Sequence, residues 1–260
     1  MSSDQTIFNS VPKFTYKEPV PEIDAEEFEK VVRSRRSVRV FKDTPIPEDI
    51  VNKCLDLALI APNSSNLQPW EFYWVRNKEK KQQLVKACFS QPAAKTAQEL
   101  FVVVARTKTW KRHARQMLDL FHSQNTAPPK AVFHYYKKIV PMAYSLGLMN
   151  VLGFLKSIAF SVIGLFRPVP REPVNRAELK LWAVKSTALA CENLMLAFRA
   201  YGYDTCPMEG FDSKRIKKLL ELPKDATVVM TISAGVRDDK GVYGQQIRFP
   251  KDQFVKEVNT

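Results

Sequence analysis

The chain has 260 residues, a formal net charge of +13 and 45 % hydrophobic residues, so its composition is that of a globular protein with an ample core. Its eight glycines form neither G-x-G-x-x-G nor G-x-x-x-x-G-K-[ST], which excludes a Rossmann dinucleotide site and a P-loop. The three histidines form no H-E-x-x-H pair, and we expect no metal site. A phosphate bound by this chain would therefore be held by arginine, lysine and hydroxyl groups.

The cysteines and the N-terminus both indicate the cytoplasm. The four cysteines are scattered without C-x-x-C spacing, and we expect buried thiols in a reducing compartment. The first residues lack the charged-then-apolar pattern of a signal peptide.

The first half of the chain predicts an extended N-terminal arm, 1–23, followed by one domain, 24–260. Asp24 with Glu27 is a capping box that predicts a helix towards Arg33. The following patterns predict, in chain order, a helix after Pro47, a turn-rich loop at 61–69, a strand at 71–75, a helix from Asn77 to Cys88 and a buried strand at 100–105.

The last third of the chain predicts a similar alternation. Asn175 with Glu178 predicts the start of a long helix that ends near Tyr201, with Gly202 as its C-terminal cap. Its apolar positions predict burial on several sides: Leu181, Val184, Leu189, Leu194, Leu196 and Phe198. A short helix at 212–220 and a buried strand at 227–234 follow. Strands alternating with helices indicate an α/β or α+β core.

The charge is concentrated in the middle of the chain. Between Arg106 and Arg171 there are eleven basic residues and one acid, Asp119, so this segment carries +10 of the total. It also holds the most apolar run of the chain, from Ile139 to Phe166, in which Lys156 is the single charged residue. This segment therefore differs in kind from what flanks it.

A dense cluster of arginines follows the first predicted helix. Four arginines and two serines lie within Arg33–Arg39, and forked guanidinium donors match the oxygens of a phosphate. Val38 and Val40 alternate with Arg39, which predicts an edge strand that directs the arginines to one side. Taken alone, the cluster is more typical of a solvated basic strand end.

Three further segments could contribute to a binding site. The loop Ala61–Trp70 (APNSSNLQPW) offers small polar side chains stiffened by two prolines. Pro207–Asp212 (PMEGFD) contains Gly210, which lets a ligand approach the backbone closely. Arg248 lies near the C-terminus. Each segment alone is typical of an ordinary loop.

Taken together and in this order, the four segments resemble the FMN-dependent nitroreductase family. The resemblance rests on R-R-S-V-R-x-F, A-P-x-S-x-N-x-Q-P-W-x-F, P-M-E-G-F and a C-terminal basic residue before x-P. It covers residues 28–105 and 175–258. It implies an α+β fold with a mixed, mainly antiparallel sheet surrounded by helices, in a homodimer that shares its active sites.

The resemblance also implies which residues bind the cofactor. The FMN phosphate and ribityl chain would be held by Arg35, Arg36, Ser37 and Arg39, with Arg248 from the C-terminal end. The flavin bound by the partner chain would be reached by Pro62, Asn63, Ser64, Ser65 and Asn66. The isoalloxazine would lie against Pro207, Met208, Glu209 and Gly210, with a backbone N–H near Glu209 or Gly210 addressing flavin N5. Gln91 is a further candidate, for the pyrimidine ring.

The implied reaction needs no catalytic side chain. A nicotinamide, from NAD(P)H, would pass hydride to flavin N5 and leave, and a nitroaromatic, quinone or similar acceptor would then be reduced in a ping-pong cycle. Gln246 stands where the family usually has a second basic residue, and Ser186 where it usually has another polar one. Both departures concern secondary contacts and leave the phosphate cluster intact.

The segment 109–172 is an insertion for which three interpretations stay open. It is a lid over the active site and dimer interface, or an interfacial membrane element whose basic residues (130–171) face anionic head groups, or a transmembrane span. The alternative to an enzyme is a flavin-binding or membrane-surface-binding module without turnover. Nucleic-acid binding is not expected, because no recognised motif accompanies the positive charge.

Overall fold

The computed structural model describes residues 17–123 and 130–259. In that part of the chain the four strands form one antiparallel sheet in the order β1-β2-β4-β3. The strands are β1 (Trp70–Trp74), β2 (Glu99–Arg106), β3 (Asp204–Met208) and β4 (Ala226–Gly235). Alternate residues of β2 face opposite sides, so both faces of the sheet can be covered.

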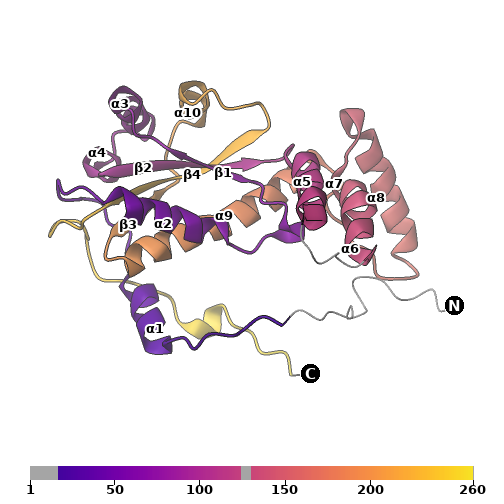
Figure 1. The fold of residues 1–260 in the computed structure, drawn as a ribbon, viewed down its shortest axis with the longest axis horizontal. Helices are drawn as coiled ribbons and strands as arrows, with labels where there is room; N and C mark the ends of the chain where they lie inside the picture. The colour runs from indigo at the N-terminus through magenta and orange to yellow at the C-terminus, as the bar shows by residue number, and fades with distance from the viewer. Residues whose placement is uncertain (1–16, 124–129, 260) are drawn as a thin grey trace.

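Helices cover each face of the sheet (Figure 1). On one face, Val102 and Val104 pack against helices α3 (Lys78–Ala87), α4 (Pro92–Thr96) and α10 (Ser213–Leu219). On the other face, Phe101 and Val103 pack against α2 (Glu48–Leu59) and α9 (Arg176–Ala200). Helix α1 (Ala25–Ser34) buries no residue and lies below this layer. The fold is therefore the α+β architecture expected from the sequence.

The insertion adds its own helices at the far end of the sheet. They are α5 (Trp110–Ser123), α6 (Lys130–His134), a π-helical stretch (Tyr135–Ile139), α7 (Val140–Tyr144) and α8 (Val151–Ile163). The segments up to α7 form a third core cluster with the first turns of α9, including Tyr136, Tyr144 and Trp182. Helix α8 stands outside that cluster.

Most predicted helix starts are confirmed by the caps. The side chain of Asp24 accepts from Glu27 N, that of Asn77 from Lys80 N, and that of Asn175 from Glu178 N. Gly202 follows α9 with a φ of +86°, as a C-terminal glycine cap requires. All four cysteines, Cys54, Cys88, Cys191 and Cys206, are buried and unpaired, as expected.

Three expectations need correction. Residues 38–40 form no edge strand, because the segment makes only isolated bridges, Ser37 to Thr205 and Phe41 to Arg237. The P-M-E-G motif is not wholly a loop, since its first two residues end strand β3. Helix α9 is buried over most of its length, but Leu181 and Leu189 are about half exposed because they face away from the sheet.

The apolar run of the insertion is broken. Among the described residues, no single helix is long and apolar enough to cross a membrane; 130–144 and 148–163 meet that criterion only as a pair, bent by 71°. Within the predicted arm, 1–16 lie outside the described residues, and 17–24 are exposed without helix or strand.

Candidate active site

The arginine cluster and the C-terminal arginine meet in one pocket. A cavity of about 250 Å³ is lined by Arg35, Arg36, Ser37, Arg39 and Arg248, together with residues 242–247. We call it the arginine pocket. Among the residues that the structure describes, no carboxylate lines it, and one acid forms an ion pair with these arginines, Glu192, 3.7 Å from Arg35 Nε. The pocket therefore concentrates positive charge with donors left for an anion.

The backbone around Val38 builds this pocket. Val38 N donates to Thr205 O (3.0 Å) and Arg39 N donates to Gly241 O (2.7 Å), so the segment is held between β3 and the chain at 241. Gly241 is needed there, because a Cβ atom would lie 2.6 Å from Val40 O. Val38 is fully buried and Arg39 is exposed, so alternation directs the arginine outwards even without a strand.

The arginine side chains rest on carbonyl groups and an aromatic ring. Arg36 Nη2 donates to Gly244 O (2.5 Å), and Arg248 Nη1 donates to Ile247 O (2.7 Å). The Arg39 guanidinium lies 5.3 Å from the centre of the Tyr243 ring. These contacts orient each guanidinium without neutralising its charge. Each guanidinium keeps further N–H donors for a ligand.

The P-M-E-G segment lies at the end of the strand beside this pocket. Met208 is buried, whereas Glu209 and Gly210 are exposed. Gln91 Nε2 donates to Gly210 O (2.7 Å) and to Cys88 O (3.1 Å), so Gln91 lies at this segment. Its contact with a pyrimidine ring stays a prediction. From Thr205 to Glu209 the backbone spans about 13 Å. A flat ring system on a phosphorylated chain fits this span, with its phosphate among the arginines.

The loop Pro62–Asn66, here called the serine loop, is fastened by tyrosines of the insertion. The Tyr144 hydroxyl lies 3.0 Å from Ser64 Oγ and 3.1 Å from Ser65 Oγ. The hydroxyl of Tyr135 lies 2.6 Å from Ser65 Oγ, and that of Tyr136 donates to Ser65 O (3.0 Å). Burial raises the pKa of Tyr136 to about 12, so its hydroxyl stays protonated near neutral pH.

The hydrogen bonds from the tyrosines hold the serine loop in an unusual backbone conformation. Ser65 and Asn66 have φ values of 59° and 47°, in the left-handed region that non-glycine residues rarely adopt. Such conformations persist where the surroundings over-determine them, and the three tyrosines do so here. Asn63 adds to this by accepting from Gln68 N (2.7 Å). The sequence alone did not identify these tyrosines as site residues. They lie 70 to 80 positions after the serines that they contact, and a contact over that separation leaves no local pattern.

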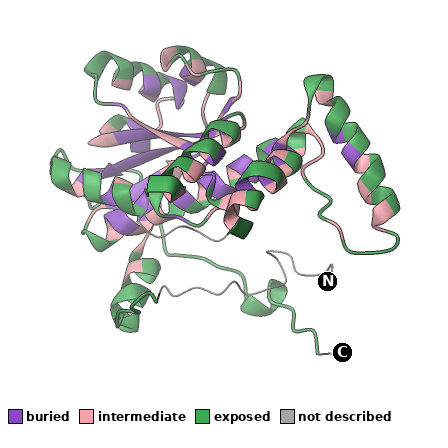
Figure 2. Ribbon diagram, turned by 45° about the vertical axis from the view of Figure 1, so that its right-hand side comes forward, coloured by how far each residue is buried: buried purple, intermediate pink, exposed green. Residues whose placement is uncertain are grey.

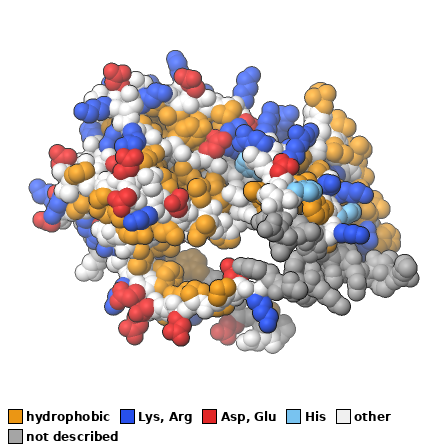
Figure 3. All heavy atoms as spheres, in the orientation of Figure 1, with side chains coloured by type: hydrophobic (Ala, Val, Ile, Leu, Met, Phe, Trp, Pro, Cys, Tyr) orange, Lys and Arg blue, Asp and Glu red, His pale blue; other side chains and the backbone are white. Residues whose placement is uncertain are grey.

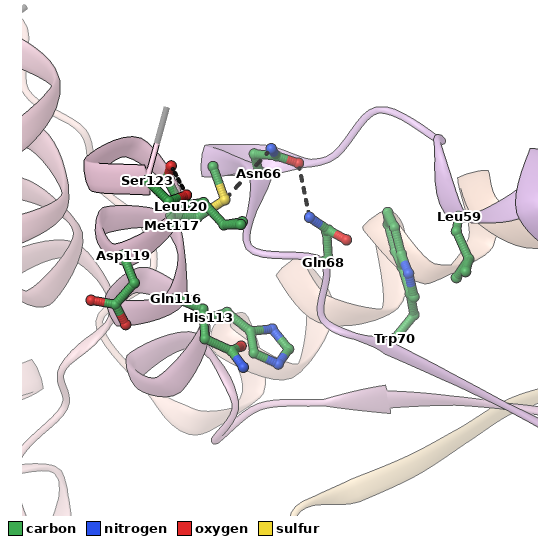
Figure 4. Close-up of a pocket in the computed structure, with 10 residues that line it drawn as sticks. All are labelled: Leu59, Asn66, Gln68, Trp70, His113, Gln116, Met117, Asp119, Leu120 and Ser123. Carbon is green, nitrogen blue, oxygen red and sulfur yellow. Dashed lines mark hydrogen bonds between the residues drawn. The ribbon is translucent and has the colours of Figure 1, made fainter. Parts of the chain in front are cut away.

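A cavity of about 740 Å³ lies between the serine loop and helix α5 (Figure 4). From α5, His113 and Gln116 line it, and from the other side Gln68 and Trp70 do. His113 Nδ1 donates to Leu67 O (2.7 Å), which joins α5 to this loop. The histidine therefore has a structural role in this cavity wall.

The arginine pocket and the serine loop lie at opposite ends of the sheet. Thr205, beside the pocket, is level with Ala234 and Glu99, whereas Trp70, after the serine loop, is level with Ala105. Six residues of β2 separate these levels, about 20 Å along the strand. Figure 1 shows the same separation, with β3 and α1 at one end and α5 at the other. The arginine pocket and the serine loop of one chain are therefore far apart along the strands.

Thiol chemistry has no place at this site. Cys206 is buried behind the arginines, and burial raises the pKa of its thiol although Arg39 and Arg35 act in the opposite direction. Among the described residues, no group of three or more His, Cys, Asp or Glu could hold a metal ion. The arrangement offers anion binding, backbone and polar contacts rather than a nucleophile.

Comparison with known proteins places these features in a family. The model of the nitroreductase family matches residues 32–236. The chain is 27 % identical to a Thermus thermophilus protein named NADH dehydrogenase, over 85 % of this chain and 91 % of that one. It is 26 % identical to a 4-nitrobenzoate reductase of Pseudomonas putida, over 87 % and 92 %.

A solved structure shows the same fold. An Exiguobacterium sibiricum protein in complex with FMN superposes with a TM-score of 0.65 at 24 % identity, covering 89 % of this chain and 97 % of the other. Its similarity to this chain is one of architecture.

Proposed function

The chain belongs to the nitroreductase family, and on that premise we propose that it passes hydride from NAD(P)H through FMN to a nitroaromatic, quinone or similar acceptor in a ping-pong cycle. It is an FMN oxidoreductase with NAD(P)H as its reductant, as its family and its relatives named NADH dehydrogenase and 4-nitrobenzoate reductase support. The single observation in the structure that carries the proposal is the arginine pocket, where four arginines converge and no carboxylate of 17–123 or 130–259 contributes to the lining.

Each group of residues has a distinct part. Arg35, Arg36, Arg39 and Arg248, with Ser37, would hold the phosphate. Pro207 to Gly210, with Gln91 behind them, would support the ring, and the exposed backbone at 209–210 is open to a donor contact with it. When bound, FMN supplies the hydride chemistry, so the chain itself needs only to orient the ring and admit each substrate in turn.

We propose that the active site is completed by a second copy. The serine loop lies about 20 Å from the arginine pocket of its own chain, so it would serve the ring held by a partner. Exposed apolar residues of α1, of the chain at the end of α2 and of the C-terminal segment would be covered by such a partner: Phe28, Val32, Leu57, Ile60, Phe249 and Phe254. The cavity between the serine loop and α5 would then line the acceptor side.

The surface of the insertion suggests which acceptor the enzyme reduces and where in the cell it acts. Its apolar and basic surface suits a lipophilic acceptor such as a quinone. We therefore propose a cytoplasmic enzyme that contacts an anionic membrane surface through 130–171, and retain a lid as the other role of this segment. The lid would involve α5 to α7, whose tyrosines bind the serine loop.

The test measures cofactor binding and turnover separately. The double variant Arg36→Gln/Arg248→Gln should raise the Kd for FMN by roughly 10- to 100-fold, since a hydrogen bond to a charged group contributes about 1.5–3 kcal/mol. The matched control is Arg33→Gln, an exposed arginine outside the pocket that pairs with Glu29 on its own helix. Fluorescence quenching of free FMN gives the affinity.

Steady-state oxidation of NADH and NADPH, with menadione or a nitroaromatic, then separates an enzyme from a module that only binds flavin. Unchanged FMN affinity in the double variant would remove the arginine pocket from the proposal. Bound FMN without NAD(P)H oxidation would favour the module without turnover.

A further inference from the structure

Helix α8 is apolar, yet it is exposed on most of its surface. Of its thirteen residues, only Gly153 and Lys156 are buried. Its outward residues include Phe154, 64 % exposed, and Leu155, Ile158 and Val162, each 50–55 % exposed. Figure 2 shows the helix as a largely exposed element beside the body, and Figure 3 shows hydrophobic side chains gathered over it. A contiguous apolar surface of this kind marks a contact site.

The orientation of α8 is fixed by its one charged residue. Lys156 Nζ points inward and donates to Met142 O (3.1 Å), Ala143 O (2.9 Å) and Pro173 O (3.4 Å). Gly153 lies so close to the chain that a Cβ atom would be 2.1 Å from Val174 O. The usual amphipathic pattern is thus inverted, with the lysine inside and the leucines outside. The contacts of Lys156 hold the apolar face towards solvent.

A pocket with unpaired cations lies at the base of this helix. Its volume is about 660 Å³, and it is lined by Lys108, Arg176, Lys180 and Lys224. The one acid among its described lining residues, Asp225, forms an ion pair with Arg106 (Nε to Oδ2, 3.1 Å). Within 17–123 and 130–259 no carboxylate lies within ion-pair distance of the four cations, whose side chains are exposed. We call it the lysine pocket.

The lysine pocket is basic on one side and apolar on the other. Leu146, Leu148 and Met149 line it and lead directly into α8. Trp110, from α5, contributes an amphipathic ring. The basic side of the pocket, which suits a phosphate, therefore adjoins an apolar surface that suits acyl chains.

We propose that this surface docks on a membrane containing anionic phospholipid, with a phosphate head group in the lysine pocket and α8 in the interfacial layer. Charge complementarity carries this choice of occupant. A second copy on the same face would bring two segments of +10 together, and like charges across an interface oppose association. The lysine pocket lies largely outside 130–171 and supplies the specificity that an apolar helix lacks. This proposal rests on the membrane contact of the proposed function and adds a head-group site to it, but vesicle binding does not depend on turnover.

The test uses the full-length, FMN-loaded protein and sedimentation with vesicles. Phosphatidylcholine vesicles that contain phosphatidylglycerol should bind the protein at least ~10-fold more tightly than phosphatidylcholine alone, and added salt should weaken the binding. The triple variant Lys108→Gln/Lys180→Gln/Lys224→Gln should lose about fivefold affinity for each charge removed. The matched control is Lys78→Gln/Lys214→Gln/Lys218→Gln, which removes three exposed lysines around α3 and α10 and should change binding less than twofold.

The apolar half of the proposal needs its own variants. Leu155→Ser/Ile158→Ser should reduce the binding that persists at high salt, whereas Phe89→Ser, at another exposed apolar residue, should not. Equal losses in the lysine-pocket and control triples would show general charge attraction and overturn the head-group site. Binding of inorganic phosphate to the lysine pocket, without tighter binding to vesicles that contain phosphatidylglycerol, would identify a soluble anion as the ligand and overturn the lipid.

Failure of this proposal is distinguishable from failure of the proposed function. A protein that stays in the supernatant with anionic vesicles at low salt overturns membrane docking, while its NAD(P)H oxidation with a soluble acceptor is unaffected. Loss of that oxidation with intact vesicle binding would overturn the proposed function and leave membrane docking in place.

Discussion

Helices α8 and α9 are both rich in apolar residues and lie in opposite environments. Helix α9 crosses the sheet and buries eleven residues, among them Leu194 and Phe198. Helix α8 buries two, one of which is Lys156. Apolar content is therefore not what determines burial here. A helix is covered when it has a sheet face to pack on, and the insertion places α8 where no such face is available.

The largest expected contrast is in stability. Leu194→Ala should lower the free energy of unfolding by about 3 kcal/mol, because Leu194 is fully buried and its truncation leaves a cavity. Leu155→Ala on α8 should change it by less than about 0.5 kcal/mol, since Leu155 is already 55 % exposed. Urea unfolding followed by circular dichroism measures both. Equal losses would mean that α8 is covered within the protein.

Two neighbouring residues extend the contrast to charges. Asp225 is bound by Arg106 and accepts from Lys108 N, whereas Lys224 is unpaired in the lysine pocket. Asp225→Asn should cost about 2 kcal/mol of unfolding free energy, as expected for hydrogen bonds to a charged group. Lys224→Gln should cost less than about 0.5 kcal/mol.

The effect of Asp225 should depend on pH. Burial alone would raise the pKa of this carboxyl, but the hydrogen bonds from Arg106 and Lys108 N outweigh it and hold the pKa below its ordinary value of 3.8. The stabilisation is thus fully present above the unfolded pKa and is lost as pH falls through the lower, folded pKa. The difference between the wild type and Asp225→Asn should be constant at neutral pH and shrink below about pH 4. A difference that grows on acidification would contradict this assignment.

The smallest expected effect is at the junction between the insertion and the serine loop. Tyr144→Phe removes the hydroxyl next to Ser64 and Ser65 and should cost about 1 kcal/mol. Amide hydrogen exchange across 63–66 should accelerate, because the left-handed residues lose a constraint. Tyr201→Phe is the control, since that hydroxyl makes no hydrogen bond within the described part of the chain and the residue is 41 % exposed. Unchanged exchange would show that Tyr135 and Tyr136 suffice.

Local signals in the sequence predicted most elements and the family. Helix starts depend on side chains within three residues of each other, so Asp24, Asn77 and Asn175 could be identified directly. Buried strands such as β2 are continuous apolar runs. Strand β3 was missed because DTCPM is short, polar and contains proline, which is tolerated in an edge strand of the sheet.

The composition at first excluded glycine-based phosphate sites and left arginine as the alternative, and the motifs gave the family to which the chain belongs. Only the tertiary structure brought Arg248 to Arg36, because they are more than 200 residues apart in the chain. It also joined three tyrosines to the serine loop and gathered four cations at the base of α8. Such groupings depend on the packing of distant segments, and no local pattern in the sequence encodes the distance between them.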